Sequence, residues 1–220
     1  MRVLIATSNQ GKLRDFAGAA AVHGIEVAGL SGFASLPPAV EDGANLEENA
    51  RKKAEHYSRY APGELVLADD SGLSVDALNG APGVHSARYA MFEGVNSDQA
   101  NVDQAGVDQA GVDQADVDQA NNAKLLRELE EIADRERGAR FVCVISAARD
   151  GQEVAHFHGE ARGTILRQLR GELGFGYDPL FYMRELGKSF AELTPEEKAL
   201  VSHRGAALRK FLEWARVRMR

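Results

Sequence analysis

The sequence has few of the features that mark membrane-spanning or disulfide-stabilised proteins. None of its apolar runs approaches the roughly 18 residues that a transmembrane helix requires. The single cysteine, Cys143, lies in the apolar run 141–145, which excludes an internal disulfide and indicates a small core residue. With 220 residues, 44% of them hydrophobic, the chain is long enough to bury a substantial core as a globular protein.

Positive charge is also scarce, because 26 Lys and Arg stand against 33 Asp and Glu, for a formal net charge of −7. This balance argues against nucleic acid or a membrane surface as a partner, so cations that bind an anion must be gathered locally. The opening Met-Arg-Val-Leu-Ile-Ala is too short and too quickly polar for a signal peptide. The expected location is therefore the cytoplasm.

The hydrophobic pattern predicts strands that alternate with helices. We expect strands at 2–6, 25–28, 65–68, 140–148 and 153–158. We expect helices at 12–23, 45–60 and 122–135, a further helix that starts at Thr194-Pro195, and a last helix that includes 208–215. The Asp150-Gly151 pair is typical of a hairpin turn. This order favours an α/β protein with a mixed central β-sheet flanked by helices, arranged in two lobes with a substrate cleft between them.

Residues 98–120 form an internal repeat, in which Asp-Gln-Ala recurs five times at a spacing of five residues. A period of five advances a helix by about 140° net per repeat, so the valines of successive units do not form one face. We expect an inserted surface loop or polar helix without a catalytic role, within a single domain that spans residues 1–220.

Asp69 and Asp70 directly follow the apolar run 65–68 and precede Ser71-Gly72. Desolvation and mutual repulsion both oppose the ionisation of adjacent carboxylates, and a bound cation relieves both. Successive side chains of a strand point to opposite faces, so only one of the pair faces a given site. Mg²⁺ needs one or two such carboxylates in addition to substrate phosphates. The alternative is that the acids cap a turn at Ser71-Gly72.

A second polar segment follows the first strand and opens the first helix: Thr7, Ser8, Asn9, Gln10, Gly11 and Lys12. Its hydroxyls, backbone amides and ammonium are the groups that bind a phosphate at a helix N-terminus. The spacing is not that of a Walker loop. The alternative is that Ser8 or Asn9 simply caps the helix.

The helix at 45–60 carries further candidates. Asn45 and Glu48 fit a capping pattern, whereas Asn49 and Lys53 share a face at i and i+4 and can reach a site together. Glu41 lies on an expected loop and is a possible additional metal ligand.

Two later segments are also candidates. Phe175, Gly176, Tyr177 and Asp178 combine glycine, aromatic rings and an acid, which suits stacking and hydrogen bonding to a base, although a tight loop with buried rings is the alternative. Lys198, His203 and Arg204 place cations at the start of the last helix, where anions bind. His156 and His158, in an expected strand, have no zinc-like partner set in the sequence.

Taken in order, the motifs resemble those of the Ham1/RdgB family, the inosine/xanthosine triphosphate pyrophosphatases. They are Thr7-Ser8-Asn9-x-Gly11-Lys12, Glu48-Asn49-Ala50, Asp69-Asp70-Ser71-Gly72-Leu73, Gly80-Ala81-Pro82-Gly83, Ser86-Ala87-Arg88-Tyr89, Phe175-Gly176-Tyr177-Asp178-Pro179 and Ser202-His203-Arg204. The resemblance runs from Arg2 to about Phe211 and is interrupted by the repeat.

The resemblance implies an ITPase-like homodimer that hydrolyses the non-standard purine nucleotides ITP, dITP and XTP to the monophosphate and pyrophosphate, with Mg²⁺ as cofactor. It implies that Asp70 is both the catalytic base and a metal ligand, and that Glu41 is a second metal ligand. The residues implied to bind substrate are Thr7, Ser8, Asn9, Gln10, Gly11, Lys12, Lys53, Ser71, Phe175, Gly176, Tyr177, Asp178, Lys198, His203 and Arg204.

The expected reaction is attack of water on the α-phosphorus, with Lys12 and Lys53 offsetting the charge of the departing pyrophosphate. One alternative is a Maf-like pyrophosphatase that acts on modified pyrimidine nucleotides. A nucleotide-binding regulator without hydrolytic activity is a second alternative, which the intact set of acids and lysines opposes.

Overall fold

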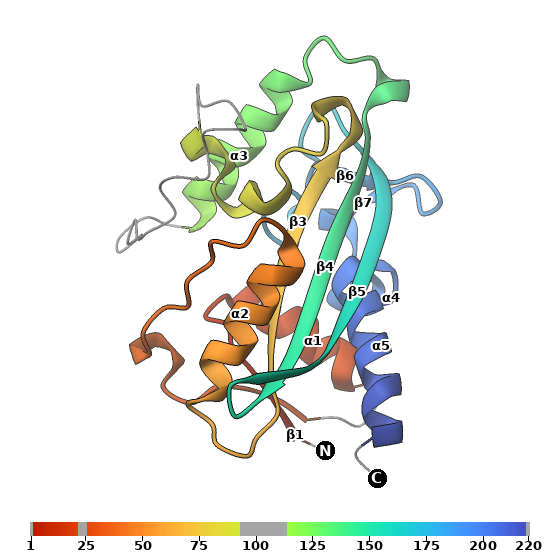
Figure 1. The fold of residues 1–220 in the computed structure, drawn as a ribbon. Coiled ribbons are helices and arrows are strands. Elements are labelled where there is room, and N and C mark those ends of the chain that lie inside the picture. The colour runs from red at the N-terminus through yellow and green to blue at the C-terminus, as the bar shows by residue number, and fades with distance from the viewer. Residues whose placement is uncertain (1, 22–25, 93–113, 219–220) are drawn as a thin grey trace. The chain divides into compact units, whose positions relative to one another are not determined.

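The computed structural model describes residues 2–21, 26–92 and 114–218 (Figure 1). The chain forms two compact units. The first unit comprises Met1–Ser71, Val142–Ala161 and Pro195–Arg220, and the second unit comprises Gly72–Phe141 and Arg162–Thr194. Within the described part of the chain, no helix is long and apolar enough to cross a membrane.

The described strands form one mixed sheet in the order β2-β1-β3-β4-β5-β6-β7. Their bounds are β1 Arg2–Ile5, β2 Glu26–Gly29, β3 Val66–Val75, β4 Gly138–Arg149, β5 Gln152–Ile165, β6 Phe181–Met183 and β7 Lys188–Ser189. β1 pairs in parallel with β2 and β3, whereas β6 is antiparallel to both β5 and β7. The prediction of a mixed α/β sheet is therefore confirmed.

The α-helices are α1 Gln10–Ala21, α2 Leu46–Ser58, α3 Gln114–Glu128, α4 Pro195–Val201 and α5 His203–Arg218. Short 3-10 segments cover 33–35, 76–78, 83–92, 134–136 and 190–192. The helices expected from the sequence are present, with shifted bounds. Pro195 occupies the first position of α4, where its missing N–H costs no helical hydrogen bond.

In the first unit, strand alternation sorts the core onto two faces of the sheet. One face carries residues such as Ile5, Leu67 and Ile145, which pack with Phe16 of α1 and Phe211 of α5. The opposite face carries Leu4, Val66 and Ala68, which pack with Ala54 and Tyr57 of α2. Each strand residue therefore faces either α1 and α5 or α2, and this rule also applies to the polar residues that follow.

Strand β3 is much longer than predicted. We expected a strand at 65–68 that ended before the two aspartates, but β3 continues to Val75, so Asp69 and Asp70 lie in mid-strand. The alternative reading, in which these acids cap a turn, is wrong. The backbone at Gly72 approaches Gly83 so closely that an added Cβ would lie 2.3 Å from the Gly83 carbonyl oxygen, which explains the glycine within the strand.

The hairpin between β4 and β5 is as predicted, with positive φ at Asp150 (52°) and Gly151 (83°). β5 extends to Ile165, well past the expected 153–158. The strands β6 and β7 were missed, because runs of two or three residues carry no periodic pattern.

Helix α3 begins at Gln114, earlier than the expected Asn122, and ends at Glu128 rather than Arg135. Its first turns come from the last part of the repeat, so that part is helical. Val117 is buried there, although most of the helix's first turn is exposed. Positions 98–113 of the repeat lie outside the described residues, and the division into one domain with two lobes and an insertion stays a prediction.

Candidate functional site

The two aspartates of β3 point to opposite faces of the sheet in the first unit. Asp69 shares its face with Leu67, toward α1 and α5, and Asp70 shares its face with Ala68, toward α2. The predicted divergence of the pair is therefore observed, although it occurs within a strand and not at its end.

Asp69 is the buried member, with a side chain only 1% exposed. Its Oδ2 atom lies 3.0 Å from Lys12 Nζ and 3.5 Å from Arg204 Nε, and it accepts a hydrogen bond from Ser71 Oγ at 2.9 Å. Burial alone would raise the pKa of Asp69, but the charges of Lys12, Arg204 and Lys53 lower it well below its usual range. Asp69 is therefore the ionised centre of a buried charge cluster.

Asp70 has a different partner. Lys53 Nζ lies 2.8 Å from Asp70 Oδ1 and 2.9 Å from Glu41 Oε2. Burial raises the pKa of Asp70, although Lys53 and Lys12 act in the opposite direction. Burial opposes the charge of Lys53, but the carboxylates of Asp70, Glu41 and Asp69 outweigh it and raise its pKa, so the ammonium persists.

This arrangement suits a divalent cation. Two carboxylates from separate segments converge on one ammonium, and carboxylate oxygens are the ligands that Mg²⁺ prefers. Lys53 thus already holds a positive charge between Asp70 and Glu41. The structure brings these two sequence-predicted metal ligands together.

Asn49 holds the loop that contains Glu41 in place, a role that the sequence did not predict. Asn49, buried in α2, accepts a hydrogen bond from the Gly43 amide through Oδ1 at 2.7 Å. An added Cβ at Gly43 would lie 2.6 Å from that oxygen, so only glycine permits the approach. Asn45 and Glu48 form the predicted cap, with the Glu48 amide bonded to Asn45 Oδ1 at 2.9 Å.

The segment 7–12 joins β1 to α1. Asn9 Oδ1 accepts the amide of Lys12 at 3.0 Å, and Thr7 Oγ1 accepts the amide of Asn9 at 3.2 Å. The cap interpretation is therefore correct for Asn9. The Lys12 side chain is 20% exposed beside this helix N-terminus. A role in phosphate binding for Thr7, Ser8, Gln10 and Gly11 stays a prediction.

The residues at the start of α5 join the same charge cluster. Asp15 of α1 lies 3.2 Å from Arg204 and 3.7 Å from Lys198 through its Oδ2 atom. His203 is buried, and burial together with the charges of Arg204 and Lys198 lowers its pKa well below the usual value, so the imidazole is neutral. Lys12, Lys198 and Arg204 thus face the carboxylates of Asp15 and Asp69 beside the N-terminus of α1.

In the second unit, the predicted base-binding segment is a tightly tied loop. Asp178 Oδ2 accepts the Phe175 amide at 2.9 Å, and the Tyr177 hydroxyl donates to the Ser86 carbonyl at 2.9 Å. Tyr177 and Asp178 are buried, whereas Phe175 and Gly176 are partly exposed. The alternative of a tight loop with buried rings thus holds for Tyr177 but not for the partly exposed Phe175, and substrate contact by the segment stays a prediction.

Two residues near these sites, Asp15 and Asp118, were not singled out from the sequence. Asp15 follows Lys12 by three residues, a helical spacing that could have indicated it. Asn49 was placed on the correct face, but its partner Gly43 was not foreseen. Asp118, from the last repeat unit, accepts the Gly176 amide at 2.6 Å, and no sequence signal indicated this contact.

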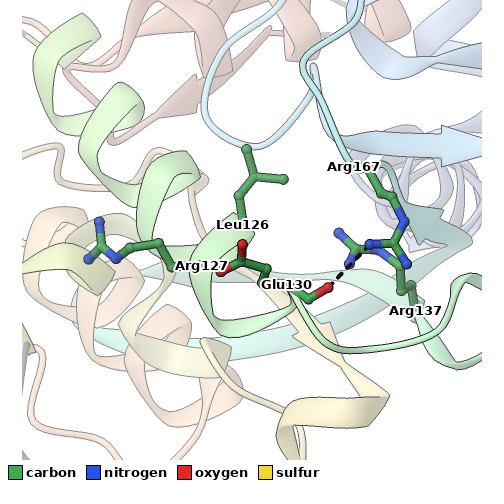
Figure 2. A pocket seen from close by; sticks show the side chains of 5 residues that line it. All are labelled: Leu126, Arg127, Glu130, Arg137 and Arg167. Atoms are coloured by element: carbon green, nitrogen blue, oxygen red, sulfur yellow. Dashed lines mark hydrogen bonds between the residues drawn. The ribbon is translucent and has the colours of Figure 1, made fainter.

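A cavity of about 390 Å³ in the second unit contains none of the predicted residues (Figure 2). Its lining includes Arg137 and Arg167, whose guanidinium groups donate to backbone carbonyls. Arg137 donates to Leu129, Ile165 and Leu166, and Arg167 donates to Glu130 and Ile132. These hydrogen bonds connect the ends of separate segments, so the two arginines have a structural role and the cavity gives no evidence of a binding site.

Comparison with known proteins gives a consistent result. A family model described as the Ham1 family matches residues 3–214. The dITP/XTP pyrophosphatase of Acidobacterium capsulatum is 45% identical over 212 residues, which cover 96% of this chain and 97% of that protein. The protein of the same name from Geobacillus kaustophilus is 45% identical over 211 residues, covering 96% and 92%. The solved structure of the Staphylococcus aureus Ham1 protein has a TM-score of 0.75 and 37% identity, with 98% of each chain covered.

Proposed function

Because the chain belongs to the Ham1 family, we propose that it hydrolyses the non-standard purine nucleoside triphosphates ITP, dITP and XTP to the monophosphate and pyrophosphate. The observation that carries this proposal is Asp70, held in mid-strand beside Lys53 and Glu41. The pyrimidine alternative is not favoured, because the relatives named above are called dITP/XTP pyrophosphatases.

A divalent metal fits the donor set, and we assign Mg²⁺ to Asp70 and Glu41. When bound, Mg²⁺ supplies Lewis-acid stabilisation of the negative charge that develops on the phosphate oxygens. Asp70 orients the water that attacks the α-phosphorus and accepts its proton. The bond from the α-phosphorus to the bridging oxygen then breaks, and pyrophosphate leaves.

The cations of the first unit account for phosphate binding. Lys12 borders the N-terminus of α1, where segment 7–12 presents hydroxyl groups and a helix dipole to an anion. The gathering of Lys12, Lys198 and Arg204 in this unit favours a triphosphate over a neutral ligand. Lys12 and Lys53 offset the charge on the departing pyrophosphate.

Base selection is assigned to the loop 175–178 of the second unit. Hypoxanthine and xanthine present a 6-oxo acceptor beside an N1–H donor, and adenine reverses that pattern. A buried site built for the first pattern leaves polar groups unpaired when adenine enters, which strongly disfavours the wrong base. Discrimination against guanine must then depend on its 2-amino group.

Product identification tests the proposal. The full chain, incubated with ITP and Mg²⁺, should release IMP and pyrophosphate in equal amounts. Release of orthophosphate would contradict cleavage at the α-phosphorus. A parallel comparison of ITP, XTP, dUTP and methylated UTP tests the base preference, and faster turnover of the pyrimidines would overturn it.

The assembly and location belong to the same proposal. The family resemblance supports a homodimer, which light scattering of the purified chain would detect as twice the monomer mass. We also assign the protein to the cytoplasm, where the nucleotide pool is found, with a small-molecule nucleotide as its partner rather than nucleic acid or a membrane.

A further inference from the structure

A second cluster of metal-ligating side chains lies in the first unit and has no part in the proposed reaction. Glu47 stands in the first turn of α2, and His156 and His158 lie two residues apart on β5. Glu47 Oε1 is 3.7 Å from His156 Nε2, and Glu47 Oε2 is 3.0 Å from His158 Nε2. One ligand atom from each of the three residues lies within 4.8 Å of the other two.

The strand period explains why both histidines face the same way. Phe157 and Gly159 are buried on the opposite face of β5, where the Phe157 ring contacts Phe211 of α5 at a centroid distance of 5.6 Å. His156 and His158 therefore point away from α5. Their side chains are 40% and 50% exposed, and that of Glu47 is 47% exposed, so a dissolved ion can reach all three.

The spacing of the ligand atoms suits a four-coordinate ion. Zinc bonds of about 2.0–2.2 Å at the tetrahedral angle place neighbouring ligand atoms roughly 3.4 Å apart. The two distances from Glu47 to the imidazoles lie on either side of that value, each measured from a different carboxylate oxygen, and a set of one ligand atom per residue lies within 4.8 Å. The two rings are tilted by 79° with centroids 5.5 Å apart, so they do not stack on each other.

An outer carboxylate supports the same interpretation. Glu153 Oε1 lies 3.6 Å from His156 Nδ1, the ring nitrogen that does not face Glu47. Metal-binding histidines commonly direct their second nitrogen at a carboxylate, which fixes the ring and its tautomer. Glu153 is itself held by a hydrogen bond from Ser146 Oγ at 2.8 Å.

We propose that Glu47, His156 and His158 form a binding site for a transition-metal ion of the Zn²⁺ class, with water completing the coordination. Two imidazole nitrogens and one carboxylate favour Zn²⁺, Co²⁺ or Ni²⁺ over Mg²⁺, which prefers oxygen ligands alone. A bound ion would connect the start of α2 to β5. The site does not depend on the proposed hydrolytic activity.

Titration of the full chain with Co²⁺ and Zn²⁺ at about pH 8, where an ordinary imidazole is neutral, tests the proposal. Excess Mg²⁺ is included so that all-oxygen sites are filled. We expect one ion per chain in calorimetry, an intense visible absorption from four-coordinate Co²⁺, and a metal-dependent rise in melting temperature, because the ion binds only the folded chain.

Variants assign the site. His156→Ala/His158→Ala should weaken binding by more than about 100-fold, and Glu153→Gln by roughly 10-fold, in keeping with the loss of an outer partner. His56→Ala/His85→Ala removes the same number of histidines elsewhere and should leave binding unchanged. Circular dichroism without metal verifies the fold, and Glu47→Gln provides a second weakened variant.

Equal affinity of the wild type and His156→Ala/His158→Ala would overturn the proposal. An octahedral Co²⁺ spectrum in the wild type would do the same. Equal affinity would mean that Glu47 only pairs with imidazole rings at the surface, and an octahedral spectrum would mean that the ion is not held in the four-coordinate site argued above.

Discussion

The two faces of β3 place adjacent, chemically identical residues in opposite surroundings. Toward α1 and α5, Asp69 is 1% exposed and in contact with Lys12 and Arg204. Toward α2, Asp70 is 14% exposed and shares Lys53 with Glu41, whose side chain is 44% exposed. One face therefore buries its ionised carboxylate among cations, and the other leaves its carboxylate slightly exposed and close to a second acid. The comparison indicates that Asp69 organises the fold, and it supports the proposal that Asp70 performs the chemistry.

The largest expected effect is on turnover, from Asp70→Asn. The variant removes the proposed metal ligand and proton acceptor, so kcat for ITP should fall by at least about 10³-fold. Pyrophosphate release under saturating ITP and Mg²⁺ measures it. The variant should keep its melting temperature, because Lys53 retains Glu41 as a partner. Near-normal turnover in this variant would contradict the role of Asp70 as metal ligand and proton acceptor.

Asp69→Asn should instead reduce stability. It removes the buried carboxylate that Lys12 and Arg204 share, although Arg204 keeps Asp15 as a partner, and breaking a buried pair in this way costs about 3–5 kcal/mol. The free energy of unfolding in urea measures the loss. A variant with the wild-type free energy of unfolding would show that the stability of the folded chain does not depend on the ion pairs of Asp69.

The effect of Asp69→Asn should also depend on pH. Because the pKa of Asp69 is lowered in the folded chain, its contribution to the free energy of unfolding is fully present above its pKa in the unfolded chain, about 3.9. That contribution is lost as the pH falls toward the pKa of Asp69 in the folded chain. The stability difference between wild type and variant should therefore shrink below about pH 4. A difference that grew on acidification would contradict the sign of this shift.

Lys53→Met tests the face of Asp70 more gently. Loss of the ammonium should lower kcat by about 10²-fold, because one charge that stabilises the departing pyrophosphate is gone. Without substrate, Mg²⁺ should bind more tightly, since two carboxylates lose their internal cation. Calorimetric titration with Mg²⁺ checks this, and unchanged or weaker Mg²⁺ binding would argue against Asp70 and Glu41 as its ligands.

The smallest effect is expected from Asn49→Ala. It leaves the Gly43 amide without its acceptor, at a cost of roughly 1–3 kcal/mol in unfolding free energy. Because that bond fixes the loop of Glu41, the Mg²⁺ concentration for half-maximal activity should rise severalfold. Asn45→Ala is the matched control, since it removes a helix cap worth about 1 kcal/mol from the same region. If both variants needed the same Mg²⁺ concentration for half-maximal activity, Asn49 would have no specific role in positioning the metal ligand Glu41.

Much of the first unit was predictable because its signals are local. β1, α1, α2 and the hairpin at Asp150-Gly151 follow from short-range periodicity and capping residues. The divergence of Asp69 and Asp70 follows from strand alternation alone. The family resemblance depended on motifs of the same local kind, and the comparisons confirmed it.

The remaining features depend on contacts between distant segments. The continuation of β3 through Asp69 and Asp70 requires cations from α1, α2 and α5 to neutralise two mid-strand acids, and no local pattern supplies them. Likewise, His156 and His158 lacked a zinc-like partner in the sequence because Glu47 precedes them by more than 100 residues. Local propensity also could not reveal that Asp118 binds the amide of Gly176.

Hydrolysis of ITP in ¹⁸O-labelled water tests the central claim most directly, because it locates the atom that the water attacks. If Asp70 directs water at the α-phosphorus, the label should appear in the phosphate of IMP, and the pyrophosphate should remain unlabelled. Label in the pyrophosphate, with none in IMP, would place the attack on the β-phosphorus and contradict the account.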